Sequence, residues 1–357
     1  MSYSGPGSVV NLVDEFLSHW AGVDGSQGSP LLVVPEGAAV TKSRTDLTAL
    51  RALYFAVQSA PGSAPVAPPP APQFPSVTFL RNKEENGHAA LGIGRRLVVE
   101  ALGAFNRKVR GSLSHTTFPH SLPALPMADD ALADILRAAD DMFDIWTSIN
   151  AIVSPPPPPA PLFIQPLVLS LTAPGTNAPL FLDFTAAMLR LTNLKTADAN
   201  ILSAGNALSV MRPHRDNIWD RDIRPILVAY QKKVTGEFPA GHAFVTSLPR
   251  IYPAPGHTPA AVNATGQWNA ATQKGDYAWS ASTEATLQQY EVRQSPGPEY
   301  DSEASSVLAV ILPGQPLTFA TATGFETPGQ TSSVKIYVVL TTGRERGSNT
   351  VTITRPL

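Results

Sequence analysis

The chain contains one eight-residue segment twice, in slightly different form. AFNRKVRG begins at Ala104 and AYQKKVTG begins at Ala229, 229 − 104 = 125 residues later. Four of the eight positions are identical, and three of the four exchanges keep the character of the side chain: Phe for Tyr, Asn for Gln and Arg for Lys. Self-similarity at a fixed spacing is the signature of a chain built from copies of one structural unit.

Two further landmarks recur in the same order and at nearly the same spacing. Trp20 and Trp146 are 126 residues apart, and so are the Ser-Leu-Pro sequences that begin at Ser121 and Ser247. We therefore interpret residues 8–126 and 131–253 as two copies of one unit. The predicted domain boundaries are 1–126, 127–253 and 254–357.

Hydrophobic periodicity predicts that both copies are mostly α-helical. One helix has Leu47, Tyr54 and Val57 on its apolar face and either Ser43 or Thr45 as its N-cap. We expect Trp20 and Trp146 to be core residues rather than platforms for a ligand, because each lies on the apolar side of a predicted helix. The predicted helices span about 9–20, 43–60, 84–110, 131–150, 180–195 and 198–235.

Prolines interrupt these helical regions. Two proline-rich arms, at 60–75 and 154–166, cannot form a helix or a central strand and are expected to run as polyproline II segments. They are either flexible linkers or stiff arms that dock in a groove, and the apolar residues beside them favour docking. Pro213 and Pro225 lie within the last predicted helix, where we expect kinks or helix restarts.

The pattern changes at Pro259, where short β runs follow one another between turn residues. Seven short strands within about a hundred residues predict a β-sandwich. The fold class is therefore a multidomain α + β protein with two helical repeats followed by a seven-stranded sandwich. The predicted strands are 261–268, 277–281, 287–293, 306–311, 317–321, 333–340 and 349–354.

This last region resembles a fibronectin type III domain. YAWSAS places Trp279 where that family has a buried Trp on its second strand, and LQQYEVRQSPG resembles its third strand at Tyr290. VKIYVVLTTGRERGSNTVTITRP resembles its last two strands, with Tyr337 as the core tyrosine. The resemblance implies the fold, and it implies little about function because such modules serve as spacers, as binding domains and as parts of assemblies.

The turn TTGRERGSN is the tip through which fibronectin-type modules often contact partners. It contains Arg344, Glu345 and Arg346, and the other predicted tip, QSPGPEYDSE, contains Tyr300. These four residues are the candidate partner contacts, and an ordinary charged turn is the alternative interpretation.

The strongest candidate for a polar site is RPHRDNIWDRDIR, residues 212–224. Asp216 and Asp220 share a helix face that suits a hard cation. However, four arginines outnumber three aspartates there, and the matching part of the first copy lacks the carboxylates. We therefore predict a solvated, salt-bridged helix face. The seven histidines form none of the patterns of metal sites, so we predict no metal, no cofactor, no catalytic residue and no enzymatic activity.

Charged residues make up 15% of the chain, against about 25% in typical soluble domains, and 35 of the 357 residues are proline. A weakly charged exterior lacks the repulsion that keeps molecules apart, so it tends to be covered by a partner. A general bias towards Ala, Pro and Gly is the alternative explanation. The net charge of −2, without a basic block, argues against a nucleic acid as partner.

No targeting sequence is recognisable. The first residues lack the basic and apolar regions of a signal peptide, and no apolar run approaches ~18 residues. We expect no membrane span and a cytoplasmic protein, with signal-less export or release within an assembly left open. The absence of cysteine excludes disulfides, thiolate metal sites and thiol nucleophiles.

These observations predict a structural, self-assembling protein that forms a homo-oligomer such as a filament, a tube or a shell. The weak surface charge, the proline arms and the possible edge strands 306–311 and 349–354 support this prediction. The alternative is a monomeric module that binds a protein or a glycan through the sandwich loops. That alternative ranks second because the predicted tips offer only Tyr300 for a ligand to stack on.

Overall fold

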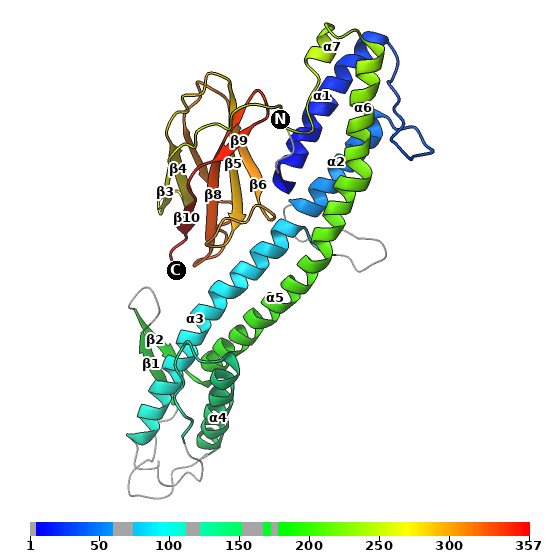
Figure 1. The fold of residues 1–357 in the computed structure, drawn as a ribbon. Helices are drawn as coiled ribbons and strands as arrows, with labels where there is room; N and C mark the ends of the chain where they lie inside the picture. The colour runs from blue at the N-terminus through cyan, green and yellow to red at the C-terminus, as the bar shows by residue number, and fades with distance from the viewer. Residues whose placement is uncertain (1–4, 60–73, 112–121, 152–166, 173–177) are drawn as a thin grey trace, which may run out of the picture. The chain divides into compact units, whose positions relative to one another are not determined.

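The computed structural model describes residues 5–59, 74–111, 122–151, 167–172 and 178–357. Helices dominate the first 246 residues, and antiparallel sheets make up the C-terminal region (Figure 1). The mixed α and β character expected from the sequence is therefore present. Residues 60–73 of the first proline arm, the whole second arm and Ser121 lie outside the described residues, whereas Leu122 and Pro123 of the Ser-Leu-Pro landmark are described.

The helices lie close to the predicted ranges in the first copy and in α4. The residue before α2, Ser43, forms a capping box with Asp46, as the sequence suggested for its N-cap. Leu47, Tyr54 and Val57 on the apolar face of α2 are buried. The helical elements are η1 Pro6–Ser8, α1 Val9–Gln27, α2 Arg44–Gln58, α3 Val77–Arg110, α4 Leu132–Asn150, α5 Phe184–Asn217, the π-helix η3 Ile218–Ile223, α6 Arg224–Glu237 and α7 Ala243–Thr246.

The second copy differs from the expected pattern at two places. A hairpin of β1 Leu169–Thr172 and β2 Pro179–Leu182 replaces the start of the helix expected from 180. The separate helices expected at 180–195 and 198–235 are joined, since α5, η3 and α6 follow one another without a break. Pro213 is exposed inside α5 and does not end it, and Pro225 directly follows the π-helical turn η3, in the first turn of α6.

The described chain forms two compact units. One comprises Met1–Glu85 with Ala204–Arg355, and the other comprises Asn86–Ser203 with Pro356–Leu357. These boundaries differ from the predicted ones at 126 and 253, because the divisions fall inside the two long helices α3 and α5. That residues 8–126 and 131–253 are copies of one unit stays a prediction.

Each unit has a helical core that combines segments from both predicted copies. In the first unit, Trp20 of α1 stacks on Tyr230 of α6 with ring centroids 4.3 Å apart. In the second unit, Phe105 of α3 packs on Trp146 of α4 with centroids 5.5 Å apart. All four side chains are fully buried, which confirms that both tryptophans are core residues. In each core a tryptophan of one copy therefore meets the aromatic residue of the other copy's repeated segment.

The C-terminal region consists of two antiparallel sheets that pack face to face over a shared apolar core. The strand order is β10-β8-β5-β6 in one sheet, with β9 also paired to β8, and β3-β4-β7 in the other. The strands are β3 Ala264–Asn269, β4 Lys274–Trp279, β5 Leu287–Pro296, β6 Ser306–Ile311, β7 Thr318–Thr321, β8 Thr331–Leu340, β9 Glu345–Gly347 and β10 Val351–Thr354.

The region has eight strand segments where seven were expected, because two segments follow β8 and both pair with it. Tyr337 pairs with Gly347 of β9, whereas Val334 pairs with Val351 of β10, so the register shifts by one residue between the two segments. Ser348 fills the irregularity: its hydroxyl accepts from the Ile336 N–H, and its own N–H donates to the Ile336 carbonyl. The bulge thus leaves no backbone group of Ile336 unpaired.

Two of the three residues that support the fibronectin resemblance lie in the core. Trp279 of β4 and Tyr290 of β5 are buried between the sheets. The expectation for Tyr337 was wrong. Side chains alternate along a strand, and Ile336 and Val338 take the core positions on β8, so Tyr337 lies on the outer face of the sheet.

Candidate functional site

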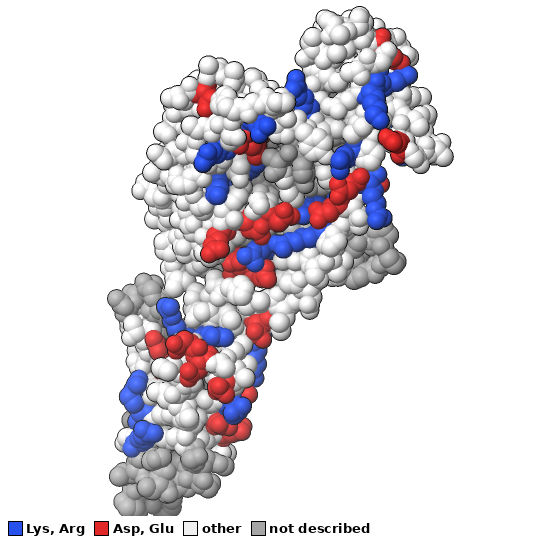
Figure 2. Space-filling view, in the orientation of Figure 1, with Lys and Arg blue, Asp and Glu red and all other residues white. Residues whose placement is uncertain are grey.

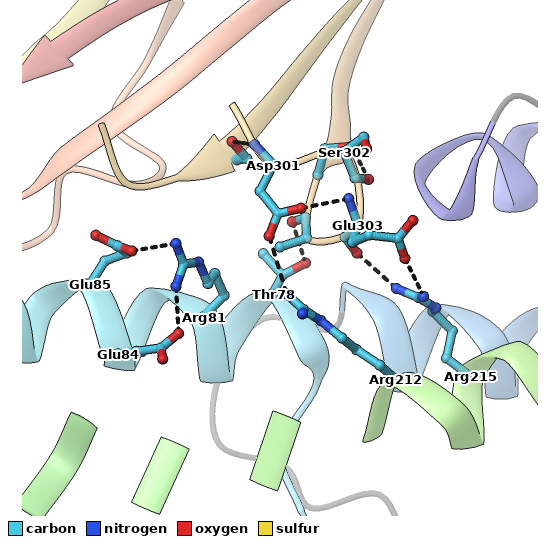
Figure 3. A network of polar contacts seen from close by, with 12 residues as sticks. Thr78, Arg81, Glu84, Glu85, Arg212, Arg215, Asp301, Ser302 and Glu303 are labelled. Carbon is cyan, nitrogen blue, oxygen red and sulfur yellow. Dashed lines mark hydrogen bonds and ion pairs between the residues drawn. The ribbon is translucent and has the colours of Figure 1, made fainter. Parts of the chain in front are cut away.

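A loop of the sandwich packs against helices of the same unit. Residues 299–305, called the docking loop below, lie between β5 and β6, and their acidic side chains face arginines of α3 and α5 (Figure 3). The loop is also held by hydrogen bonds within the sandwich. The Asp301 N–H donates to Ser295 Oγ, and the Glu303 N–H donates to Asp301 Oδ1, both at 2.9 Å.

Arg215 of α5 is buried beneath this loop, with only 1% of its side chain exposed. Its Nη2 lies 2.6 Å from Glu303 Oε2 and 2.8 Å from Asp216 Oδ1. Burial opposes the charged form of Arg215, but Tyr54, Asp216 and Glu303 together favour it more strongly, and the pKa of Arg215 is raised. Arg215 is therefore a charged anchor between α5 and the docking loop.

Three consecutive backbone carbonyls of the loop face hydrogen-bonding side chains of the helices. The Glu303 carbonyl accepts from Arg215 Nη1 at 2.8 Å, and both it and the Ser305 carbonyl accept from Nε2 of the fully buried Gln58. Thr78 Oγ1 lies 3.3 Å from the Ala304 carbonyl. Because the helix side chains bond to backbone carbonyls of the loop rather than to its side chains, these bonds fix the path of the loop backbone.

Further ion pairs surround this contact. Arg212 Nη2 lies 3.1 Å from Asp301 Oδ2, and Arg81 of α3 pairs with Glu84 and Glu85 one turn along its own helix (Figure 3). Gln330, which precedes β8, donates to Asn82 of α3. Asp301 and Glu303 of the docking loop are thus paired with arginines of α5, an arrangement suited to fastening the sandwich to the helices, whereas Glu299 is exposed.

The four predicted partner contacts occupy different environments. Glu345 forms a two-pronged ion pair with Arg293, at 2.7 and 2.8 Å, and Arg344 Nε donates to the Ala254 carbonyl. Tyr300 packs near Tyr337 and has a raised pKa, chiefly through burial. Arg346 is exposed. The structure therefore brings Glu345 and Tyr300 into a largely buried cluster on the outer sheet face and leaves Arg346 at the surface.

Arg293 is the centre of that cluster. Its side chain is 5% exposed, it also pairs with the fully buried Glu291, and its guanidinium lies 4.0 Å from the centre of the Tyr337 ring. Burial opposes the charge on Arg293, yet Glu291 and Glu345 raise its pKa. This explains why Tyr337 faces outward, since its ring covers a buried guanidinium.

A cleft of about 790 Å³ lies between α1, the segment after α7 and the start of β5. His19 lines it, with Nδ1 2.7 Å from the Tyr230 hydroxyl and Nε2 2.9 Å from the Phe244 carbonyl. Since a carbonyl can only accept, Nε2 donates and Nδ1 accepts from Tyr230. Both nitrogens are therefore occupied, and burial lowers the pKa of His19.

The predicted polar segment 212–224 does not lie on a single solvated face. Arg224 and Asp220 form the exposed pair expected four residues apart, at 3.7 Å. Arg215 is instead buried, because the docking loop covers it. The surplus of arginine over aspartate in this segment was the signal that an acidic partner lies elsewhere in the sequence. Gln58 and the docking loop itself carried no such signal.

Within the described ranges, no group of three or more His, Asp or Glu side chains is arranged to hold a metal ion. Asp216 and Asp220 thus form no such group. In the same part of the chain, none of the helices combines the length and the apolar run that crossing a bilayer requires.

Comparison with known proteins gives no family for this chain. No family model matches it, and no curated protein matches it. Among solved structures, a Fn3-like protein from Clostridium thermocellum aligns with 15% identity and a TM-score of 0.22, over 28% of this chain and 97% of that one. It is a weak structural neighbour.

Pectate lyases are also similar to part of the chain. PelI from Erwinia chrysanthemi, in complex with tetragalacturonic acid, aligns with 20% identity and a TM-score of 0.22, over 26% of this chain and 28% of that one. Pel3 from Pectobacterium carotovorum aligns with 13% identity and a TM-score of 0.21, over 25% of this chain and 26% of that one. The chain thus spans less than a third of either lyase, and likeness at this level says nothing about activity.

Proposed function

We propose that the protein is a non-catalytic structural subunit that assembles with copies of itself through an edge of its five-stranded sheet. The observation that carries this proposal is the composition of β6, which lies at the end of the order β10-β8-β5-β6. Its sequence SVLAVI contains no charged residue and no proline. Val310 is 42% exposed, and Leu312 just beyond the strand is 55% exposed.

Such an edge favours pairing between chains. An edge strand presents unpaired N–H and C=O groups, and natural proteins usually block it with lysine, proline or a covering segment. The other edge, β10, is adjacent to β3, and the Asn349 side chain bonds both backbone groups of Ala264 there. At β6 the short helix η1 lies near the Ser306 end. Val310 lines the cleft beside α1, so the stretch of β6 around it is the more open edge, and a partner strand would reach it through that cleft.

The docking loop supports a structural role. Arg215, Gln58 and Thr78 hold the loop by contacts to its side chains and backbone. The sandwich and the helices of this unit therefore form one body, as a subunit with a fixed shape requires. The same contacts weigh against a monomeric module that binds a protein or a glycan through its loops. Tyr300 and Glu345, two of the residues such a module would use, are engaged inside the chain.

Light scattering coupled to size-exclusion chromatography tests the proposal. We expect a mass that rises above 37.9 kDa with protein concentration. Val310→Lys places a charge at the open edge and should reduce the assembled fraction at least tenfold. Ala278→Lys is the matched control, because Ala278 is exposed on β4, the middle strand of the other sheet. A monodisperse 37.9 kDa species at high concentration would overturn the proposal.

A further inference from the structure

Opposite charges are segregated on two helical segments of the unit Asn86–Ser203. The part of α3 in this unit carries five basic residues and one acidic residue, a net charge of 5 − 1 = +4. The segment 129–144, which leads into and includes most of α4, carries six aspartates and one arginine, a net charge of 1 − 6 = −5. In a chain with only 15% charged residues, this concentration is a distinctive surface feature.

Three charges of each set follow the helical repeat and form a stripe, although the exposed Arg137 lies on the same face as the aspartates and the exposed Glu100 on the same face as the arginines. On α4, Asp134, Asp141 and Asp144 are exposed at positions i, i+7 and i+10, which share one face. On α3, Arg96, Arg107 and Arg110 are exposed at i, i+11 and i+14, again on one face. At 1.5 Å per residue the stripes are about 15 Å and about 21 Å long. They are called the acidic stripe and the basic stripe below.

Most of these charges have no partner of opposite sign within the chain. Asp141, Asp144, Arg96, Arg107 and Arg110 form no ion pair with any described residue, and Asp134 has only a weak contact with Arg137 at 3.6 Å. The sequence ranges outside the described residues contain no Asp, Glu, Lys or Arg. Partners for these charges therefore have to come from another molecule or from solvent ions.

Helix dipoles account for only part of this pattern. Asp134 lies in the first turn of α4 and Arg110 in the last turn of α3, where such charges are favourable. Asp144 lies in the C-terminal half of α4, where a negative charge gains nothing from the dipole. Arg96 lies mid-helix in α3, outside the last turn to which the effect is confined. The stripes thus extend beyond what stabilising each helix requires.

We infer that the acidic stripe of one copy docks on the basic stripe of a second copy. The two stripes are similar in length and nearly balance in charge, and Figure 2 shows red side chains over the region of α4 and blue ones along the edge at the C-terminal end of α3. Because the two surfaces differ, the contact is heterologous, and repeating it gives a ring or a filament rather than a closed two-fold dimer. This inference rests on the proposed self-assembly and adds a second contact to it.

Charge reversal with rescue tests the inference on the full chain. Asp141→Lys with Asp144→Lys, and separately Arg107→Glu with Arg110→Glu, should each reduce the assembled fraction in light scattering at least tenfold. An equimolar mixture of the two double variants should assemble again, because each then offers the other two complementary contacts. Assembly of the wild type should weaken as salt is raised from 50 to roughly 500 mM, as screening shortens the range of charge attraction to a few ångströms.

The control and the outcomes separate this inference from the proposed function. Asp220→Lys with Asp222→Lys is the control for the aspartate variant, because it makes the same change in net charge on exposed residues of the other unit. It should leave the assembly unchanged. If the wild type assembles and both stripe variants assemble equally well, the stripe contact is wrong and self-assembly stands. If the wild type stays at 37.9 kDa, both are wrong. Rescue in the mixture excludes misfolding as the cause of lost assembly.

Discussion

The indole of Trp20 stacks on the phenol ring of Tyr230, with the two planes 21° apart and the ring centroids at 4.3 Å. Trp20 belongs to the first predicted copy and Tyr230 to the second. The matching residues, Phe105 and Trp146, pack together in the other unit. If the two copies arose by duplication, the tryptophan of each copy now packs against the aromatic residue, Phe105 or Tyr230, in the repeated segment of the other copy.

Trp20→Ala should lower the free energy of unfolding by about 3–5 kcal/mol, because it removes a fully buried aromatic side chain and leaves a cavity. Urea unfolding followed by circular dichroism measures this. Phe55→Ala is the control, since Phe55 on α2 is 37% exposed and should cost far less. A loss below about 1 kcal/mol for Trp20→Ala would contradict the packing described.

Arg215→Met should loosen the docking loop, because Glu303 and Gln58 lose their shared partner while a buried polar side chain remains. Because the carboxylates of Glu303 and Asp216 are about half exposed, water screens the charges left behind, and the cost should be smaller than the ~3–5 kcal/mol typical of a fully buried pair. Hydrogen exchange should show faster exchange of the amides of Asp301 and Glu303. Arg221→Met, at an exposed position, should leave these amides unchanged. Equal exchange in both variants would show that Arg215 does not anchor the loop.

Acidification should destabilise the fold through His19. Burial lowers the pKa of His19 in the folded state, so the unfolded state, with a pKa near 6.5, takes up the proton first. The contribution of His19 to the free energy of unfolding is therefore constant above pH 7 and falls as the pH drops below about 6.5. His19→Gln should flatten the stability profile between pH 7 and 5. His214 has a pKa shifted the same way by burial, so His214→Gln should remove a separate part of the slope.

Ser43→Ala should cost about 1 kcal/mol, because the capping box of α2 loses the hydroxyl that accepts from the Asp46 N–H. Ser43→Gly should cost only a few tenths of that. The control is Thr45→Ala, which tests the other N-cap candidate suggested by the sequence and should change stability by less than about 0.5 kcal/mol. Thermal unfolding measures the loss of stability in the three variants. A larger loss for Thr45→Ala than for Ser43→Ala would show that Thr45, and not Ser43, is the N-cap.

Local chemistry made several features predictable. Ser43 was recognisable because a cap depends on neighbouring residues alone. The burial of Tyr54 followed from a periodicity of 3.6 residues, and that of Trp279 was implied by the resemblance to fibronectin type III domains. Tyr337 was misplaced because alternation along β8 fixes which residues share a face but not which face meets the core. The outward orientation of Tyr337 depends on Arg293, 44 residues earlier in the sequence, because the Tyr337 ring packs over the buried Arg293 guanidinium.

The candidate site was less predictable because it depends on contacts between distant segments. Arg215 and Glu303 are 88 residues apart in sequence, and the surplus of arginine around Arg215 indicates an acidic partner without indicating which residue it is. The extra strand β9 depends on Ser348, whose hydroxyl replaces a backbone group at a bulge. Composition and spacing therefore identify neither Glu303 as the partner of Arg215 nor Ser348 as the residue at the bulge.

The pairing of Trp20 with Tyr230 also imposes an order on biosynthesis. At roughly 5–20 residues per second, the ribosome needs about 10–40 s to add the 230 − 20 = 210 residues that separate them. During that time the apolar face of α1 has no Tyr230 to pack against. The core around Phe105 and Trp146 lies entirely within residues 98–194, so it is complete in sequence earlier. The nascent chain should therefore form the core around Phe105 and Trp146 first. The apolar face of α1 should depend on chaperones until α6 leaves the ribosome.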